Sequence, residues 1–255
     1  MPSKTPQFDR ALEEILNDLE PQHRVCKTCD GDFEIFQEDI EMYYKLRVLP
    51  PRECPQCRMR KRMAMMANIL QFYKKECTAH PRERVISQMD EDNRYKIYDN
   101  KYWHDINAWD AINMERPYDT SRPFMEQLIS LIRDVPHMAL ARYNKDIINS
   151  DYAVDSFSIK NCYLVSTAAF SENISYGTWV LSSRDSIDLL SADHLERCFD
   201  ANNCIRCSNS QHIQNCTNCS DSYFLFECHN CQYCFGCVNL RNKKYCFFNE
   251  QLTRE

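Results

Sequence analysis

The stretch CFDANNCIRCSNSQHIQNCTNCSDSYFLFECHNCQYCFGC, residues 198–237, decides the fold because its small and apolar residues fall at fixed intervals. Every third residue from position 198 is Cys, Ala, Ser, Ile or Leu, and related positions recur in steps of 12. A fixed period sustained over many repeats is typical of a repeat architecture. The stretch therefore predicts stacked coils of 12 residues each.

The same period extends in both directions from this stretch. A step of 12 from Ser150 reaches, in order, Cys162, Ile174, Ser186, Cys198, Ser210, Ser222, Cys234 and Cys246. The three columns between these positions are also small or apolar, apart from Lys243 at the end of one of them. The pattern thus predicts eight turns over residues 150–255.

The spacing also predicts the shape of each coil. Side chains three apart on a straight strand point to opposite faces, so a chain that turns every third residue inward must bend within most triplets. The result is a narrow, nearly four-sided β-solenoid, whose bends need residues that tolerate unusual backbone angles. Asn or Asp stands just before many inward positions, at Asn161, Asn173, Asp185, Asn203, Asn209, Asn215 and Asp221. The offsets are similar to those of insect antifreeze β-solenoids, but the outward threonine rows of those proteins are absent, so ice binding is not implied.

Two Cys-x2-Cys pairs, Cys26/Cys29 and Cys54/Cys57, lie near the N-terminus and are separated by 24 residues. Two such pairs complete the tetrahedral S4 shell of a structural zinc ion, with bonds of about 2.3 Å, and leave no position for a catalytic water. A redox pair or buried thiols are the alternative. A strand expected at 33–36 and a helix after Cys57 indicate a treble-clef or zinc-ribbon-like module over residues 21–75. We expect one structural zinc ion.

A basic run, Arg58, Arg60, Lys61 and Arg62, follows the second pair on a predicted helix. Such a run can contact nucleic-acid phosphates when a zinc module positions it. The alternative is a solvated helix face beside an acidic body.

Other cysteines could also bind metal. Cys77 and His80 have the spacing of half a zinc site, with His104 as the nearby candidate to complete it. No matching Cys pair follows, and the alternative is that this half-site is a structural accident. In the solenoid, Cys204, Cys207, Cys216 and Cys219 could hold zinc or an iron–sulfur cluster. The alternative for the solenoid is a set of compact thiols that fill a tight core.

The rest of the chain is predicted as helices and a mixed segment. An apolar stripe over residues 8–19 predicts a helix within an N-terminal segment of residues 1–20. Residues 76–149 form a mixed α/β connecting segment that caps the solenoid, with strands at 84–87 and 95–98. A helix follows, with Ser121 as its N-cap, Pro123 in its first turn and Pro136 after its end.

Bulk properties limit the function. The net charge of −6 excludes an overall basic surface that would trap nucleic acid. No apolar run is long enough for a transmembrane helix, and the first residues lack the apolar core of a signal peptide. Together with sixteen cysteines, this favours a reducing, cytoplasmic location without membrane contact. The histidines are scattered, and no phosphate loop or nucleophile elbow is present, so we expect no enzyme.

Several strings resemble an uncharacterised, cysteine-rich, zinc-ribbon-like bacterial family known mainly from metagenome-derived genomes. The strings include CPQCR at 54–58, LQFY at 70–73, WHD at 103–105, SRPF at 121–124, CSDSYFLF at 219–226 and CFGCVNLRNKKYC at 234–246. The resemblance implies a zinc-ribbon-like N-terminus and a Cys-rich repeat region, with no assigned activity. Some relatives carry a further Cys pair where this chain has Cys77 and His80. Relatives also continue past the stretch like 249–252, so we expect this chain to be a fragment.

These patterns favour a non-catalytic zinc-binding scaffold or interaction protein, since solenoids present long surfaces to partners. A nucleic-acid-binding protein that uses the basic run is the alternative. A β-helix enzyme acting on a polymer ranks lowest, because the solenoid aspartates fall at differing offsets. The last coil lacks an evident cap and carries Phe235, Tyr245, Phe247 and Phe248, which predicts self-association there.

Overall fold

The computed structural model describes residues 6–64, 70–90, 92, 94–142 and 146–254. The chain divides into two compact units, Met1–Asn68 and Ile69–Glu255. No helix among the described residues is both long enough and apolar enough to cross a membrane.

Within residues 6–64, the first unit contains a two-stranded antiparallel hairpin and three helices. Its elements are α1 (Pro6–Asn17), β1 (Gln22–Val25), β2 (Asp32–Ile35), α2 (Gln37–Leu46) and α3 (Pro55–Ala64). The strand expected at 33–36 is β2, and the helix expected after Cys57 is α3, which already includes Cys57. The core of this unit is small, and it combines Phe33, Ile35 and Ile40 with three of the cysteines.

The second unit begins with short elements that precede the solenoid. They are β3 (Tyr73–Glu76), β4 (Arg84–Ser87), β5 (Ile97–Tyr98), α4 (Asn100–Trp103), η1 (Ala111–Met114), α5 (Phe124–Asp134) and β6 (His137–Met138). β3 and β4 form an antiparallel hairpin, whereas β5 and β6 pair in parallel. Next to the first coil, Phe72 contacts Tyr152 edge to face, and Arg142 donates to the carbonyl oxygen of Ser150.

The start of α5 differs from the prediction. The N-cap is Pro123, and Ser121 instead donates its hydroxyl to Asp119 Oδ1. A residue that precedes proline is disfavoured in the helical region, so Arg122 does not start the helix, which begins after Pro123. No side chain of α5 is buried within the described part of the chain.

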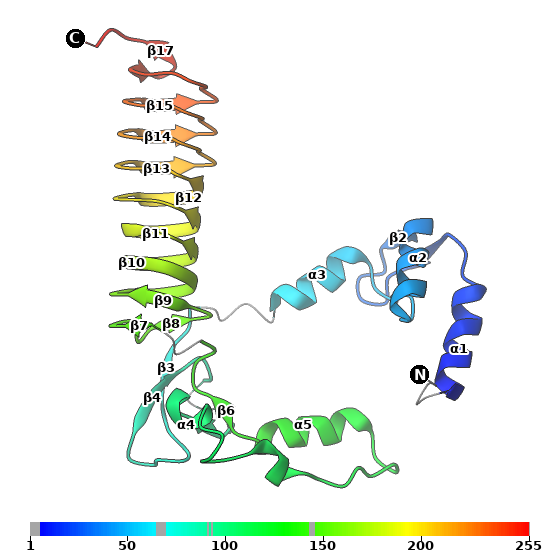
Figure 1. Ribbon diagram of the computed structural model, residues 1–255. Helices are drawn as coiled ribbons and strands as arrows, with labels where there is room; N and C mark the ends of the chain where they lie inside the picture. The colour runs from blue at the N-terminus through cyan, green and yellow to red at the C-terminus, as the bar shows by residue number, and fades with distance from the viewer. Residues whose placement is uncertain (1–5, 65–69, 91, 93, 143–145, 255) are drawn as a thin grey trace. The chain divides into compact units, whose positions relative to one another are not determined.

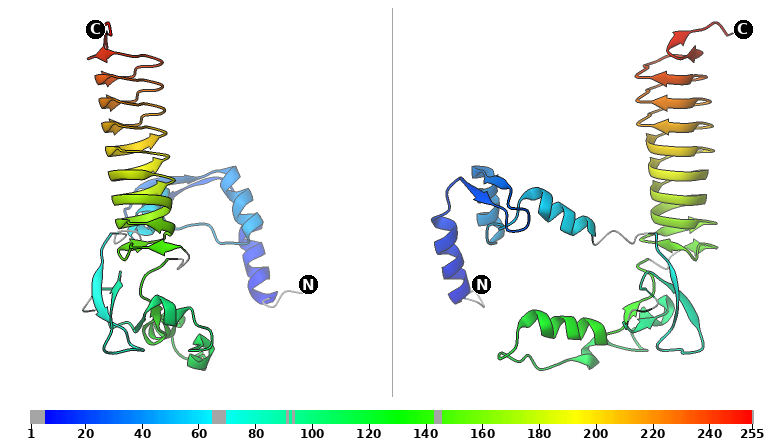
Figure 2. Two further views of the ribbon diagram at one scale, coloured as in Figure 1. Left: turned by 60° about the vertical axis from the view of Figure 1, so that its left-hand side comes forward. Right: turned by 180° about the vertical axis from the view of Figure 1, so that it is seen from behind.

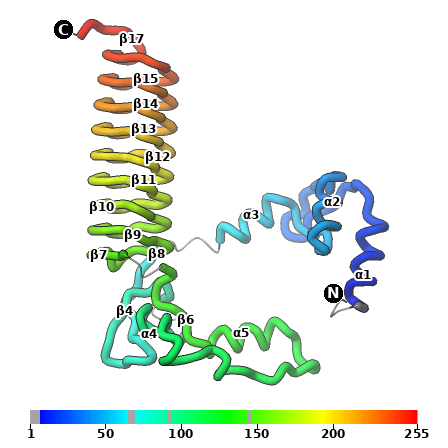
Figure 3. Tube along the Cα trace, in the orientation of Figure 1, coloured from blue at the N-terminus to red at the C-terminus, as the bar shows by residue number. Residues whose placement is uncertain are grey.

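The β-solenoid is present and winds about eight turns of roughly 12 residues over 147–247 (Figures 1 and 2). Its strands are β7 (Ile147–Ile148), β8 (Ala153–Val154), β9 (Phe157–Lys160), β10 (Tyr163–Leu181), β11 (Arg184–Asp193), β12 (Phe199–Ile205), β13 (Gln211–Gln214), β14 (Tyr223–Phe226), β15 (Phe235–Val238), β16 (Cys246–Phe247) and β17 (Glu250–Gln251). Paired residues in successive coils are 12 apart, as in Leu189↔Ala201 and Leu225↔Cys237. The predicted period is therefore the register of the parallel sheet, and the trace in Figure 3 shows one coil stacked on the next.

The bends of the coils are made by left-handed residues. Every third residue from Asp155 to Phe248 has a positive φ between 46° and 63°, and all seven predicted Asn and Asp corner positions are among them. Corner amides also join successive coils: Asn149 Nδ2 donates to Asn161 Oδ1 at 3.1 Å, and Asn161 Nδ2 donates to Asn173 Oδ1 at 3.0 Å. Bulky residues such as Phe170 and Trp179 take the same conformation, which costs about 1–2 kcal/mol at such positions.

The buried interior consists of the inward residues, and its serines connect neighbouring coils. Ser222 Oγ donates to Ser220 O at 2.7 Å and accepts the backbone N–H of Cys234, one coil further on, at 3.1 Å. The same pair of hydrogen bonds, one donated and one accepted by the hydroxyl, recurs at Ser150, Ser156, Ser171, Ser183, Ser186 and Ser210. These hydroxyls satisfy backbone groups that would otherwise be buried without a partner.

The last coil folds back on itself. β17 pairs antiparallel with β16, and Gln251 Nε2 donates to Lys244 O at 2.6 Å. The strand edge of β16 is therefore paired over its two residues.

Candidate metal centre

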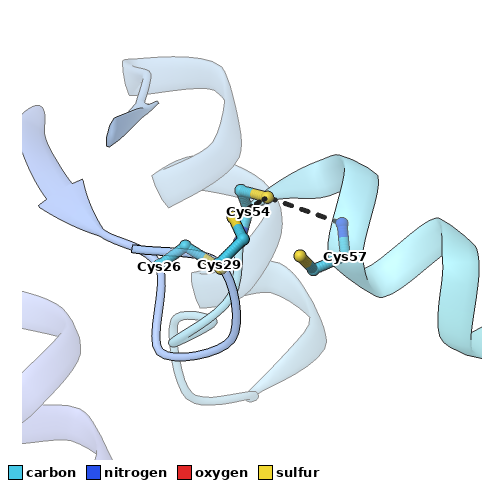
Figure 4. A group of neighbouring side chains, drawn as sticks. All are labelled: Cys26, Cys29, Cys54 and Cys57. Atoms are coloured by element: carbon cyan, nitrogen blue, oxygen red, sulfur yellow. Dashed lines mark hydrogen bonds between the residues drawn. The ribbon is translucent and has the colours of Figure 1, made fainter. Parts of the chain in front are cut away.

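The four N-terminal cysteines come from two loops of the first unit. Cys26 and Cys29 lie in the loop between β1 and β2, Cys54 directly precedes α3, and Cys57 lies in the first turn of α3 (Figure 4). The two loops are joined by a hydrogen bond from Lys27 N to Arg52 O at 3.0 Å. The sulfurs of the four residues all lie within 4.8 Å of one another.

One sulfur–sulfur separation matches an edge of a tetrahedral metal shell. The Cys29 and Cys54 sulfurs are 3.8 Å apart, and a tetrahedron with metal–sulfur bonds of about 2.3 Å has edges of about 3.8 Å. Cys26, Cys54 and Cys57 are buried, whereas Cys29 is exposed. The group could thus hold a metal ion with all four positions filled by the protein.

Nearby N–H groups favour the thiolate form of Cys26. Cys26 Sγ accepts the backbone N–H of Cys54 at 3.2 Å and that of Thr28 at 3.4 Å. The bond from Cys54 is the main reason that the pKa of Cys26 falls to about 6. Burial raises the pKa of Cys57 to about 12, so ionisation of that thiol requires a cation, which a bound metal supplies.

The basic run lies on α3, and two of its four cations have partners inside the protein. Arg60 Nη2 donates to Cys57 Sγ at 3.0 Å, and Lys61 forms an ion pair with Glu53. Arg58 is half-buried, and Arg62 is exposed. The sequence did not reveal the role of Arg60 as a donor to the cluster, although its position three residues after Cys57 places both on one helix face.

The solenoid cysteines point inward, as predicted, and face carbonyl oxygens. Cys204 Sγ lies 3.2 Å from Asn202 O and 3.5 Å from Ile213 O. Cys207, Cys216 and Cys219 make the same two kinds of contact. Among the described residues, this quartet does not converge within 4.8 Å as the N-terminal cysteines do. The geometry fits thiols that fill a narrow core.

Cys77 and His80 gain a third donor that the sequence did not reveal. The donor is Asp99, and the three ligand atoms lie within 4.8 Å of one another. His104, the expected partner, instead packs its ring against Trp103. No local signal marks Asp99, because it is 22 residues from Cys77 in the sequence.

No known protein family and no curated protein matches this sequence. The family resemblance therefore stays an expectation from the quoted strings.

Proposed function

We propose that this protein is a non-catalytic zinc-binding scaffold, in which a zinc-stabilised module and a β-solenoid serve as surfaces for interaction. The observation that carries the proposal is the convergence of the Cys26, Cys29, Cys54 and Cys57 sulfurs. Four sulfur ligands favour zinc, and a filled shell leaves no position for a reacting water.

The local fold supports a structural role for this ion. One cysteine pair lies in a β-hairpin and the other at the start of a helix, which is the ligand arrangement of a treble clef. The core of the unit is small, and the cysteines are part of it. A core of this size supplies little stability alone, so metal binding and folding are coupled.

All sixteen cysteines are described, and each is a free thiol. Clustered cysteines at this density, with the spacing of metal ligands at the N-terminus, support a reducing compartment such as the cytoplasm.

Removal of the metal tests the structural role. After chelation under reducing conditions, protease should cleave the first unit rapidly and leave the solenoid intact, and added zinc should restore resistance. A first unit that resists protease equally well without metal would contradict the proposal.

The interaction surface that we propose is a stripe of outward aromatic residues on the last coils. Phe224 contacts Phe235, and Phe235 stacks on Phe247 with ring centres 5.7 Å apart. These rings are 52%, 42% and 47% exposed, and Phe248 beside them is 69% exposed. Contiguous exposed aromatic surface of this kind supports association with a protein partner or a second copy of the chain.

Light scattering across concentration tests self-association. Phe235→Ser with Phe247→Ser should shift the protein toward monomer. The matched control is Phe170→Ser, an outward phenylalanine on β10 that is 60% exposed. A wild-type chain that remains monomeric at high concentration would exclude a second copy as the occupant of the stripe.

A further inference from the structure

A second convergent set of metal donors lies in the second unit, outside the four-cysteine cluster. Cys77 and His80 occupy the loop between β3 and β4, where His80 N donates to Cys77 O at 3.1 Å and Cys77 N donates to Glu83 O at 2.9 Å. This tight loop turns both side chains to one side. The Cys77 side chain is buried, and the His80 side chain is 42% exposed.

The two carboxylate oxygens of Asp99 have different partners. It is the N-cap of α4, and its Oδ1 accepts the backbone N–H of Tyr102 at 2.9 Å. Its Oδ2 faces the other two donors, at 3.6 Å from Cys77 Sγ and 3.2 Å from His80 Nδ1. The capping hydrogen bond to Oδ1 thus orients the carboxylate, and Oδ2 is the third metal donor beside Cys77 Sγ and His80 Nδ1. The backbone N–H of Asp99 also donates to Cys77 Sγ at 3.4 Å.

The three separations match those of a tetrahedral zinc shell. Bonds of about 2.3 Å to sulfur, 2.0 Å to nitrogen and 2.1 Å to oxygen place the S–N pair about 3.5 Å apart, the S–O pair about 3.6 Å apart and the N–O pair about 3.4 Å apart. The measured values are 3.8 Å for Cys77–His80, 3.6 Å for Cys77–Asp99 and 3.2 Å for His80–Asp99. The S–O and N–O edges agree within about 0.2 Å, and the S–N edge is about 0.3 Å longer than the ideal value.

The same three residue types occur in nucleophilic triads, but the geometry here is different. In a triad, the histidine uses one ring nitrogen for the nucleophile and the other for the carboxylate. Here Cys77 and Asp99 both face Nδ1 of His80. A single nitrogen cannot accept the thiol proton and donate to the carboxylate at once, so the arrangement fits convergence on one ion.

We propose that Cys77, His80 and Asp99 bind a second zinc ion, with a fourth position open to water or a small anion. Three protein ligands and one exchangeable ligand distinguish this site from the closed four-cysteine site.

The surroundings of Asp99 support an anionic fourth ligand. Asp99 lines a cleft of about 600 Å³ that is also lined by the cations Arg84, Lys101 and Arg142 and by the carboxylate of Asp151, so three cationic side chains face two acidic ones.

Metal counting on the full chain tests the second site. Protein purified anaerobically in reductant should hold two zinc ions, and Asp99→Asn should hold one. Asn caps a helix as well as Asp does, so this variant keeps α4 and removes only the charged ligand oxygen. The control is Asp105→Asn, where Asp105 Oδ1 also accepts a backbone N–H, that of Asn107; it should hold two. Equal metal content in wild type and Asp99→Asn would overturn the second site.

Cobalt in place of zinc tests the open position. Azide should change the cobalt absorption spectrum of wild-type protein and of Cys54→Ser/Cys57→Ser, but not that of Asp99→Asn. A wild-type spectrum that azide leaves unchanged would overturn the exchangeable ligand. Because the double variant removes the four-cysteine site alone, failure of the second site is distinguishable from failure of the proposed zinc scaffold.

Discussion

The hydroxyl of Ser222 provides a direct test of how the coils are held together. Ser222 is fully buried, and its Oγ donates to Ser220 O and accepts the N–H of Cys234. In Ser222→Ala both bonds are lost. Ser220 O retains the N–H of Tyr233 at 3.3 Å, whereas the Cys234 N–H loses the acceptor shown for it. An orphaned buried donor costs about 1–3 kcal/mol, so we expect about 2 kcal/mol.

The assay is amide hydrogen exchange of reduced protein, because it reports on single coils in a repeat protein. A loss of about 2 kcal/mol should speed exchange at Cys234 N–H by roughly 30-fold. Ser222→Cys should lie between wild type and Ser222→Ala, because a thiol still donates to the carbonyl two residues back, as Cys234 does to Gln232. The control, Ser220→Ala, changes an outward side chain of the same coil and should stay within about 0.5 kcal/mol of wild type. Equal exchange in Ser222→Ala and Ser220→Ala would refute the role of the inward hydroxyls.

Three further predictions concern the metal, the packing and the thiols. Arg60→Ala removes the guanidinium 3.0 Å from Cys57 Sγ and should weaken zinc binding by about 10-fold in a chelator competition; unchanged affinity would contradict this role. Gly177→Ala should lower stability by about 1–3 kcal/mol in thermal unfolding, because its Cβ would meet Val180 at 2.8 Å; an unchanged melting temperature would show that the core yields freely. Burial raises the pKa of Cys198 from 9.0 to about 11. Below pH 9 the thiol is protonated in both the folded and the unfolded protein. Between pH 9 and 11 only the unfolded thiol ionises, so the unfolding free energy should fall by about 1.4 kcal/mol per pH unit because of this thiol. An unfolding free energy that stays constant from pH 9 to 11 in urea titrations would contradict this prediction.

The solenoid was predictable because a single sequence period of 12 residues determines its geometry. Inward positions must be small or apolar in every coil, so the interval of 12 appears directly in the sequence and fixes the register. The corner conformation was predictable at Asn161 or Asp221, where the residue type favours it. It was hidden at Phe170 and Trp179, where the coil imposes a left-handed backbone on a side chain that disfavours it.

The sites were predictable only where the ligands lie in short motifs. The two Cys-x2-Cys pairs are recognisable from their spacing, and their sulfurs lie close together in the structure. Asp99 belongs to no sequence motif. It lies beside Cys77 and His80 because it is the N-cap of α4, a helix of four residues. The N-cap expected at Ser121 was wrong, because Pro123 restricts the residue before it and delays the start of α5.

The central claim is that the four N-terminal cysteines hold a structural zinc ion. Native mass spectrometry of anaerobically purified protein tests it most directly, by comparing the zinc content of wild type with that of Cys54→Ser/Cys57→Ser. We expect the double variant to carry one zinc ion fewer than wild type. An identical zinc content in the two proteins would contradict it.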